Sequence, residues 1–261
     1  IERGFDAQGR VTLVKEYARA SAVAATTVNL TRDEDGRITG YETWPEFDYV
    51  AGETTGAWPV DEIRSHQRQM VFFKPNLVVI YDRVRLGPKG HPSHWLAATG
   101  PKLAVDGKSF AVTNENVKMS GQVLLPREAT VESIKPFDCY PWKGQQMLQI
   151  SAPDEGNETE YLVVLTTGGQ TVPPVQATMD RRTDLVKVSL SSEGRQFAVS
   201  FNRRGAAGGA VAFSRGGRQL KHDLPCGIED TYRNWNTDAR YRQWVTQRRF
   251  DFIIPEGDRV K

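Results

Sequence analysis

The sequence predicts an all-β protein, a large antiparallel β-sandwich of two stacked sheets with few or no helices. Short apolar runs recur along the chain, separated by Gly, Pro, Asn and Asp, which is typical of strands and their turns. Helical periodicity is weak, and its best example, residues 230–247, can equally be a loop. We expect one domain over residues 1–261, with an irregular C-terminal tail after about residue 215.

The clearest strand signals form a hairpin. Residues 70–73 (MVFF) and 77–81 (LVVIY) are joined by Lys74-Pro75-Asn76, and Pro followed by Asn suits a tight turn. Polar and apolar residues alternate from Asp82 to Leu86, which predicts a strand that leaves the core and gains a solvated face. The other expected strands are residues 12–17, 26–30, 94–98, 102–105, 110–113, 117–125, 130–134, 147–151, 160–167, 185–190, 195–202 and 210–214.

The connections between these strands carry turn and loop signals. Asp106-Gly107 and Glu193-Gly194 are typical of tight hairpin turns. Residues 205–209 (GAAGG) predict another tight turn, and the acidic, breaker-rich residues 151–160 predict a loop between strands.

The charge of the chain is nearly balanced. Its 34 basic and 32 acidic residues leave a formal charge of +2, so no large field of one sign attracts nucleic acid or a membrane. No run approaches the roughly 18 apolar residues of a membrane helix. The local pairs Arg203-Arg204 and Arg248-Arg249 are expected to be solvated surface.

Few common chemical signatures are present. The sequence has no CxxC, no HExxH and no Gly-rich phosphate loop, which excludes the usual metal and nucleotide motifs. Its two cysteines, Cys139 and Cys226, are far apart and leave open whether they pair. His91 and His94 are three residues apart, which places them on opposite faces of a strand and favours a structural role over a metal pair.

Aromatic and acidic residues alternate in residues 44–58, WPEFDYVAGETTGAW. Aromatics beside carboxylates can line a sugar groove, with Trp44 and Trp58 as stacking platforms. Asp48 and Glu53 can also act as an acid and base pair, as in glycoside hydrolysis. The alternation of Phe47 and Tyr49 with polar residues favours the simpler interpretation, a strand followed by a turn.

A basic face is predicted at the start of the hairpin. Arg64, His66 and Arg68 are two residues apart, so in a strand they share one face. Such a face can hold the carboxylate of an acidic sugar, because arginine presents a planar fork of donors. It can equally be the solvated outside of a sheet.

Several of these segments follow one another in an order that resembles a known family. The run from Phe47 to Glu53, the arginines at 64 and 68, residues 71–84 (VFFKPNLVVIYDRV) and His94-Trp95-Leu96 resemble the β-sandwich domain of heparinase II/III-like polysaccharide lyases. Relatives of that family include alginate and oligoalginate lyases. The resemblance is clear over about residues 17–100 and looser up to about 215.

The resemblance implies β-elimination on a uronic-acid polysaccharide in a bacterial, periplasmic or secreted setting. A base removes the C5 proton of the uronate while its carboxylate is neutralised and the leaving oxygen is protonated. In such lyases most of these groups come from an N-terminal α/α toroid and from a His-x-His motif at the start of the sandwich. We expect both before Ile1, so this chain is expected to hold no catalytic residue and to be inactive alone.

The resemblance also bears on a metal site and on the substrate wall. The family commonly has a metal-ligating His in an Ala-His-Asn-Thr-Val stretch, where this chain has Ala24-Ala25-Thr26-Thr27-Val28, so no family zinc or calcium site is expected. One hypothesis makes the domain a wall of the lyase cleft; the alternative, which Ala25 favours, is a non-catalytic carbohydrate-binding or scaffolding sandwich. The residues predicted to bind substrate are Trp44, Asp48, Tyr49, Glu53, Arg64 and His66, with Arg64 and His66 facing uronate carboxylates.

Overall fold

The computed structural model describes residues 2–5, 11–17, 24–28, 37–55, 58–100, 102–135, 145–153, 156–215 and 218–225. These residues form 19 strands, and none of them belongs to an α-helix. The chain divides into two compact units, Ile1–Asp33 with Ile228–Lys261, and Glu34–Gly227. Each is described by itself, and a single domain over residues 1–261 stays a prediction.

The first unit contains one antiparallel sheet. Its strands are β1 (Glu2–Phe5), β2 (Val11–Tyr17) and β3 (Ala24–Val28), in the order β1-β2-β3. Strand β2 confirms the prediction at residues 12–17, β3 begins two residues earlier than predicted, and β1 was not predicted. Residues 230–247, Arg248, Arg249, Cys139 and Cys226 lie outside the described residues.

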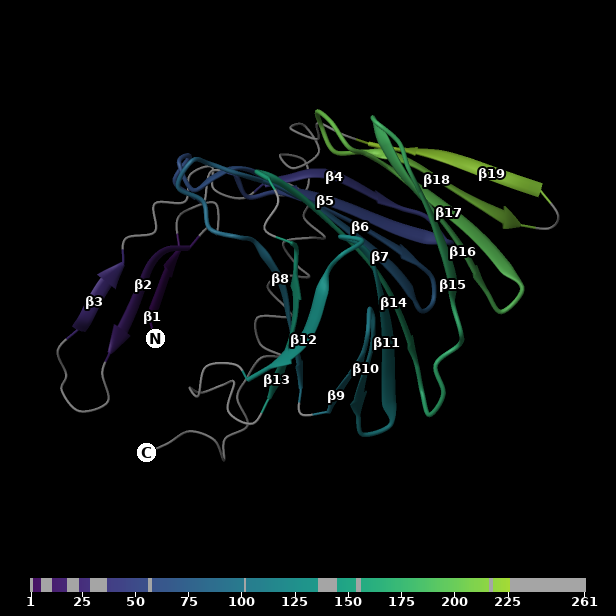
Figure 1. Cartoon of the computed structure of the whole chain (residues 1–261), viewed down its shortest axis with the longest axis horizontal. Coiled ribbons are helices and arrows are strands. Elements are labelled where there is room, and N and C mark those ends of the chain that lie inside the picture. Colours follow the sequence, from purple (N-terminus) through teal and green to yellow (C-terminus); the bar gives the residue numbers. More distant parts are fainter. Residues whose placement is uncertain are drawn as a thin grey trace. The chain divides into compact units, whose positions relative to one another are not determined.

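The second unit contains three antiparallel sheets (Figure 1). The eight-stranded sheet has the order β4-β5-β6-β7-β14-β11-β10-β9, and the smaller sheets have the orders β12-β13-β8 and β15-β16-β17-β18-β19. The large sheet consists of β4 (Arg37–Thr43), β5 (Phe47–Glu53), β6 (Ile63–Phe73), β7 (Leu77–Leu86), β9 (Leu103–Asp106), β10 (Ser109–Asn114), β11 (Val117–Leu125) and β14 (Glu158–Gly168). The smaller sheets consist of β8 (His94–Gly100), β12 (Thr130–Ile134), β13 (Gln146–Ser151), β15 (Gln176–Arg181), β16 (Leu185–Ser192), β17 (Arg195–Asn202), β18 (Gly209–Arg215) and β19 (Arg218–Leu224).

The main core lies between the eight-stranded and five-stranded sheets. Alternate residues of β5, Phe47, Tyr49 and Ala51, point into it because side chains alternate between the faces of a strand. Rings from both sheets meet there, and the Tyr81 ring stacks on Phe201 at 5.2 Å between centroids. This packing confirms the predicted antiparallel sandwich of two stacked sheets.

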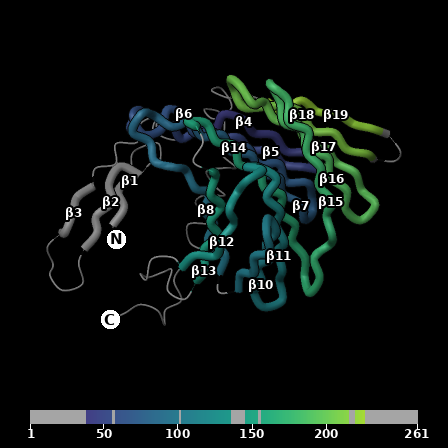
Figure 2. Tube along the Cα trace, viewed as in Figure 1, coloured from purple at the N-terminus to yellow at the C-terminus, as the bar shows by residue number. Residues whose placement is uncertain are grey.

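A second core covers the other face of the eight-stranded sheet. Strands β8 and β13 contribute Trp95, Leu148 and Ile150 to it, against Ile80 and Val163 of the large sheet. Strands β7 and β14, far apart in sequence, run side by side and are buried on both faces (Figure 2). This explains why residues 77–81 read as a continuous apolar run rather than an alternation.

The hairpin at residues 70–81 is confirmed. Strands β6 and β7 pair in the register Phe73↔Leu77, and Lys74-Pro75-Asn76 connects them. The solvated face predicted beyond Tyr81 is wrong for two residues. Asp82 is buried, and Arg83 is half-buried, because the covering sheets extend over this end of β7 and both side chains find polar partners there.

Strands β4, β15 and β19 were not predicted. Strand β19 falls within the segment expected to be an irregular tail. Leu220, His222 and Leu224 alternate along it and face the main core, where the His222 ring lies 5.9 Å from that of Phe213. The alternation is a strand signal, but polar residues between these positions weaken it.

Gly121 makes room for a neighbouring ring. It pairs with Phe110 across β10 and β11, and a Cβ at Gly121 would lie 2.1 Å from Phe110 Cζ. Because Phe110 is buried, Gly121→Ala is expected to lower the free energy of unfolding by about 1–3 kcal/mol. Urea denaturation measures this loss, with exposed Gly169→Ala as the control. Equal stabilities of the two variants would contradict the packing argument.

Candidate functional site

A polar hollow rich in arginine lies where the eight-stranded and five-stranded sheets meet. Its volume is about 560 Å³, within the range of about 300–1,000 Å³ typical of ligand pockets. We call it the arginine pocket; it is lined by Ser65, Gln67, Arg83, Val84, Arg85, Glu158, Thr159, Glu160, Arg181, Thr183, Arg203, Arg204 and Gly205. Five arginines oppose two glutamates, which leaves a formal excess of three positive charges.

Strand register assembles the floor of the arginine pocket. Arg83 of β7 lies opposite Glu160 of β14 on one side and Gln67 of β6 on the other. Two residues further along, Arg85 lies opposite Glu158 in the same way. Because alternate residues share a face, these side chains form two polar rows on the side that the five-stranded sheet covers.

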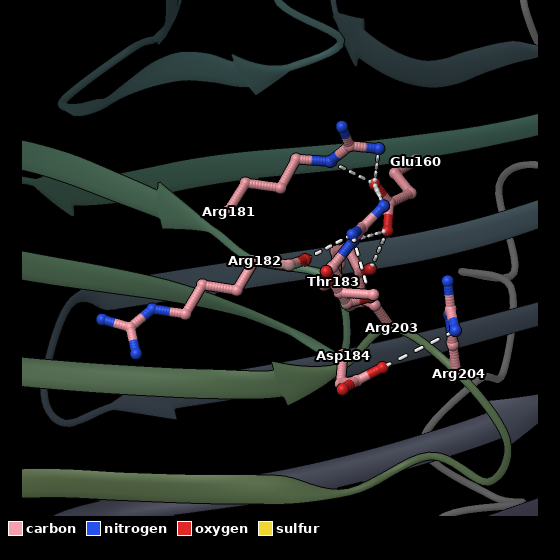
Figure 3. Close-up of polar contacts among 8 residues, drawn as sticks. Glu160, Arg181, Arg182, Thr183, Asp184, Arg203 and Arg204 are labelled. Atoms are coloured by element: carbon pink, nitrogen blue, oxygen red, sulfur yellow. Dashed lines mark hydrogen bonds and ion pairs between the residues drawn. The ribbon is translucent and has the colours of Figure 1, made fainter.

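Glu160 is the hub of the pocket (Figure 3). Its carboxylate accepts hydrogen bonds from Tyr81 Oη at 2.6 Å, Arg181 Nε at 2.7 Å and Arg203 Nε at 2.7 Å. The side chain of Glu160 is 11% exposed and that of Arg203 18%. One carboxylate therefore ties β14 to the ends of β15 and β17.

The protonation of the hub follows from these contacts. Burial disfavours the charged carboxylate of Glu160, but hydrogen bonds from Arg203, Tyr81 and Arg181 outweigh it and hold its pKa below the ordinary value. Burial, reinforced by the charge of Glu160, raises the pKa of Tyr81, so its hydroxyl stays protonated. Neither group is suited to take a proton from a substrate at neutral pH.

Arg83 is the least compensated cation of the pocket. Its Nη2 donates to Gly205 O at 2.7 Å and to Gln67 Oε1, whereas its buried Nε has no hydrogen-bond partner among the described residues. Burial is the main cause of a lowered pKa for its guanidinium. A buried donor without an acceptor is costly to the fold, and because this Nε is screened from solvent it is not offered to a ligand.

The loop that carries Gly205, a lining residue of the pocket, is anchored by a buried glutamine. Gln69 is buried, and its Oε1 accepts hydrogen bonds from Tyr49 Oη at 3.0 Å and from the backbone N–H of Gly208 at 2.7 Å. The connection predicted near residues 205–209 is present, but it is a longer loop over residues 203–208 rather than a tight turn, and Gly209 already belongs to β18. The surface prediction for Arg203-Arg204 is corrected for Arg203, because its side chain turns inward to Glu160.

Tyr49, predicted to touch the glycan, is placed in the core instead. Its side chain is 1% exposed and packs under the five-stranded sheet. Its hydroxyl donates to Gln69, so a sugar cannot stack on this ring. The period-two alternation of β5 that favoured a strand is the reason, since it places Tyr49 on the same face as Phe47.

The other five predicted residues fall into two groups at opposite ends of β5. Trp44 and Asp48 lie at the start, where Asp48 forms an ion pair of 2.8 Å with Lys74 and the exposed Trp44 ring lies 4.2 Å from that of His222. Glu53, Arg64 and His66 lie at the other end. Asp48 and Glu53 are separated by about 16 Å of extended strand, too far for a catalytic carboxylate pair.

Arg64 and His66 do not share a regular face. The register of β6 against β7 shifts between Ile63 and Ser65, which interrupts the period-two alternation at Arg64. Arg64 is exposed, whereas His66 is half-buried with its Nδ1 2.7 Å from Thr54 Oγ1. The structure therefore does not bring the six residues together, and a binding role stays a prediction for the five other than Tyr49.

Arg68 and Asp82 form an ion pair on the opposite side of the sheet from the arginine pocket. Arg68 donates from Nε to Asp82 Oδ1 and from Nη2 to Oδ2, each at 2.7 Å, and its guanidinium lies 5.9 Å from the centre of the Trp95 ring. The Asp82 side chain is 1% exposed and that of Arg68 45%. Such a bidentate pair fixes Arg68 in the fold rather than freeing it for a ligand.

His66 makes stability depend on pH. Burial lowers its pKa below the ordinary 6.5, with Asp82 opposing and Arg68 reinforcing this effect. The unfolded chain takes up the proton first, so the free energy of unfolding should fall as the pH drops below about 6.5. His66→Gln is expected to reduce the loss of melting temperature between about pH 8 and pH 5. Exposed His91→Gln is the control, and an equal effect of both variants would contradict this assignment.

Comparisons with known proteins were made against families, curated sequences and solved structures. No family model and no curated protein matches the chain. The similar solved structures are heparan sulfate lyases and heparinase III. A mutant of the heparan sulfate lyase HepC from Pedobacter heparinus is 15% identical, with a TM-score of 0.49 over 65% of this chain and 28% of that one. The heparinase III BT4657 gene product is 13% identical, with a TM-score of 0.49 over 72% of this chain and 28% of that one.

At 13–15% identity and TM-scores below 0.5, these matches give no residue of this chain a role. The chain spans 28% of the length of each of these two structures. Within the described residues, no three or more His, Cys, Asp or Glu side chains are grouped to hold a metal, and no helix has the length and apolar character needed to cross a bilayer.

Proposed function

We propose that this chain is the β-sandwich part of a polysaccharide lyase that cleaves uronic-acid-containing glycans by β-elimination. Its role is to bind the acidic glycan, and the main catalytic groups lie in other parts of the longer protein. The arginine pocket is the observation that supports binding, because its five guanidinium groups outnumber its two carboxylates. Arginine pairs with carboxylates and sulfates through two parallel hydrogen bonds.

We place the catalytic base outside the arginine pocket. β-Elimination needs a base that can accept the C5 proton near neutral pH. Tyr81 keeps its proton in the bond to Glu160, and the Glu160 carboxylate is already occupied by three donors. We therefore propose that the base and the leaving-group acid belong to a partner domain, an α/α toroid. The whole protein is proposed to be periplasmic or secreted, with Ala25 in place of the metal ligand of its sandwich.

A non-catalytic carbohydrate-binding sandwich is the second candidate. The arginine pocket serves both functions, and Ala25 in β3 favours the second. The full-length protein separates them: incubated with heparan sulfate, alginate or hyaluronan, a lyase increases the absorbance of the unsaturated uronate product. The absence of product from every acidic glycan would reject the lyase and leave the binding module.

Retention of the chain on an immobilised acidic glycan tests the binding itself. Arg85→Gln and Arg204→Gln each remove an exposed cation of the pocket and should weaken binding to heparan sulfate about tenfold, since a charged hydrogen bond contributes about 1.5–3 kcal/mol. Both variants should therefore elute at lower salt. Arg182→Gln is the matched control, because this exposed arginine pairs with Asp180 and points away from Glu160 (Figure 3).

Three outcomes would contradict these expectations. If both pocket variants elute together with the control, the arginine pocket is not the binding site. If Arg64→Ala weakens retention instead, the wall predicted from the sequence is the binding site. Failure of the unaltered chain to bind any acidic glycan would reject the proposed function.

A further inference from the structure

A second hollow adjoins the arginine pocket. It has a volume of about 410 Å³ and is lined by Leu125, Pro126, Arg127, Ala152, Pro153, Glu158, Thr159, Glu160 and Arg181. Four of these residues, Glu158, Thr159, Glu160 and Arg181, also line the arginine pocket. The two hollows therefore meet along the first residues of β14, with Arg181 on the wall of both.

The second hollow has a different composition from the first. Its lining includes the apolar residues Leu125, Pro126, Ala152 and Pro153, and apolar surface suits the C–H face of a sugar ring. Arg127 supplies its own cation; this side chain is exposed and forms no ion pair among the residues that the structure describes. Arg181 lines both hollows, and its Nη2 lies 2.6 Å from Glu160 Oε2.

The charges along the two hollows suit an extended polyanion. Together they hold six arginines and two glutamates, a formal excess of four positive charges. Glu160 is neutralised by Arg181 and Arg203, and the 72% exposed side chain of Glu158 can turn toward water. Cations thus line both of the hollows that share the first residues of β14.

We infer that the two hollows form one groove that binds consecutive acidic sugars of a single chain. One acid group lies against Arg83, Arg203 and Arg204, and a second lies between Arg127 and Arg181. This inference rests on the proposed binding of acidic glycans and adds that the bound segment contains at least two acidic sugars. Two linked sites bind one molecule more tightly than either binds alone, because the second contact is intramolecular.

Size-defined heparan sulfate oligosaccharides test the groove. In isothermal titration calorimetry the hexasaccharide should bind at least about tenfold more tightly than the disaccharide. Arg127→Gln should weaken the hexasaccharide about tenfold and leave the disaccharide unchanged, since the disaccharide fills the more basic pocket first. Arg204→Gln should weaken both, and Arg182→Gln should weaken neither.

The outcomes separate the groove from the proposed function. If the hexasaccharide and the disaccharide bind equally, or Arg127→Gln behaves as Arg182→Gln does, the groove is wrong while glycan binding stands. If neither oligosaccharide binds the unaltered chain, the proposed function falls and the groove with it.

Discussion

Glu160→Gln is expected to lower the free energy of unfolding by roughly 2–4 kcal/mol. This range spans the free-energy cost of losing one charged hydrogen bond and the larger cost of removing one partner of a buried ion pair. The substitution keeps the side-chain volume but removes the charge that holds Arg181 and Arg203, and it leaves Arg203 close to Arg83 without that charge. Urea denaturation with intrinsic fluorescence measures the loss at pH 7.

Glu158→Gln is the matched control two residues away on the same face of β14. Its ion pair with Arg85 is exposed, so the cost should be below about 1 kcal/mol. The difference between the two variants should shrink as the pH falls below about 4.5, because the low pKa of Glu160 stabilises the fold only while its carboxylate is charged.

The Glu160→Gln variant also reports on anion binding. Without the internal carboxylate, its arginines should bind inorganic sulfate, so millimolar sulfate at constant ionic strength should raise its melting temperature more than that of the original chain. Equal shifts would show that the arginines turn to solvent when Glu160 is lost, and would contradict a preformed anion site.

Arg68→Met is expected to have the largest effect, a loss of about 3–5 kcal/mol, because it leaves the carboxylate of Asp82 buried without its cation. Methionine retains the apolar part of the contact with Trp95, so the effect comes mainly from the charge. Urea denaturation measures the loss.

A double variant distinguishes pairing from packing. Arg68→Met with Asp82→Leu removes both charges and should recover most of the lost stability, since well-packed apolar residues can replace a buried ion pair at little cost. A double variant as unstable as Arg68→Met would show that packing around Trp95, and not the unpaired carboxylate, is responsible. Arg182→Leu, which breaks an exposed ion pair of 2.8 Å with Asp180, should cost below about 1 kcal/mol.

Most of the fold could be predicted from local patterns. Apolar runs bounded by turn residues located the hairpin at Lys74-Pro75-Asn76 and most strands of both stacked sheets. The missed strands have weaker patterns: β15 (QATMDR) alternates small, polar and charged residues, and β19 keeps only three inward positions. The three strands of the covering sheet were predicted, but their position as a third layer was not, because the unbroken apolar run of β7 is also consistent with the centre of a simple sandwich.

Only part of the arginine pocket could be predicted from the sequence. Arg83 and Arg85 alternate with Val84 and Leu86, which marks a polar face but not what lies above it. The contact that builds the site joins Glu160 to Arg203, 43 residues later, and to Tyr81, 79 residues earlier. Such distant pairings depend on the order of strands in the sheets, which no local periodicity encodes.

The two-sided cover of β7 and β14 also affects how recognition can change in this protein. Where both faces of a strand are sealed, as at residues 77–81 of β7, a substitution alters packing and cannot create a new contact with a glycan. The exposed cations of the groove that make no contact with Glu160 lie instead at strand ends and connections, at Arg85, Arg127 and Arg204. Specificity for a different acidic sugar can therefore be acquired at the margins of the sheets, at positions whose replacement leaves the melting temperature nearly unchanged.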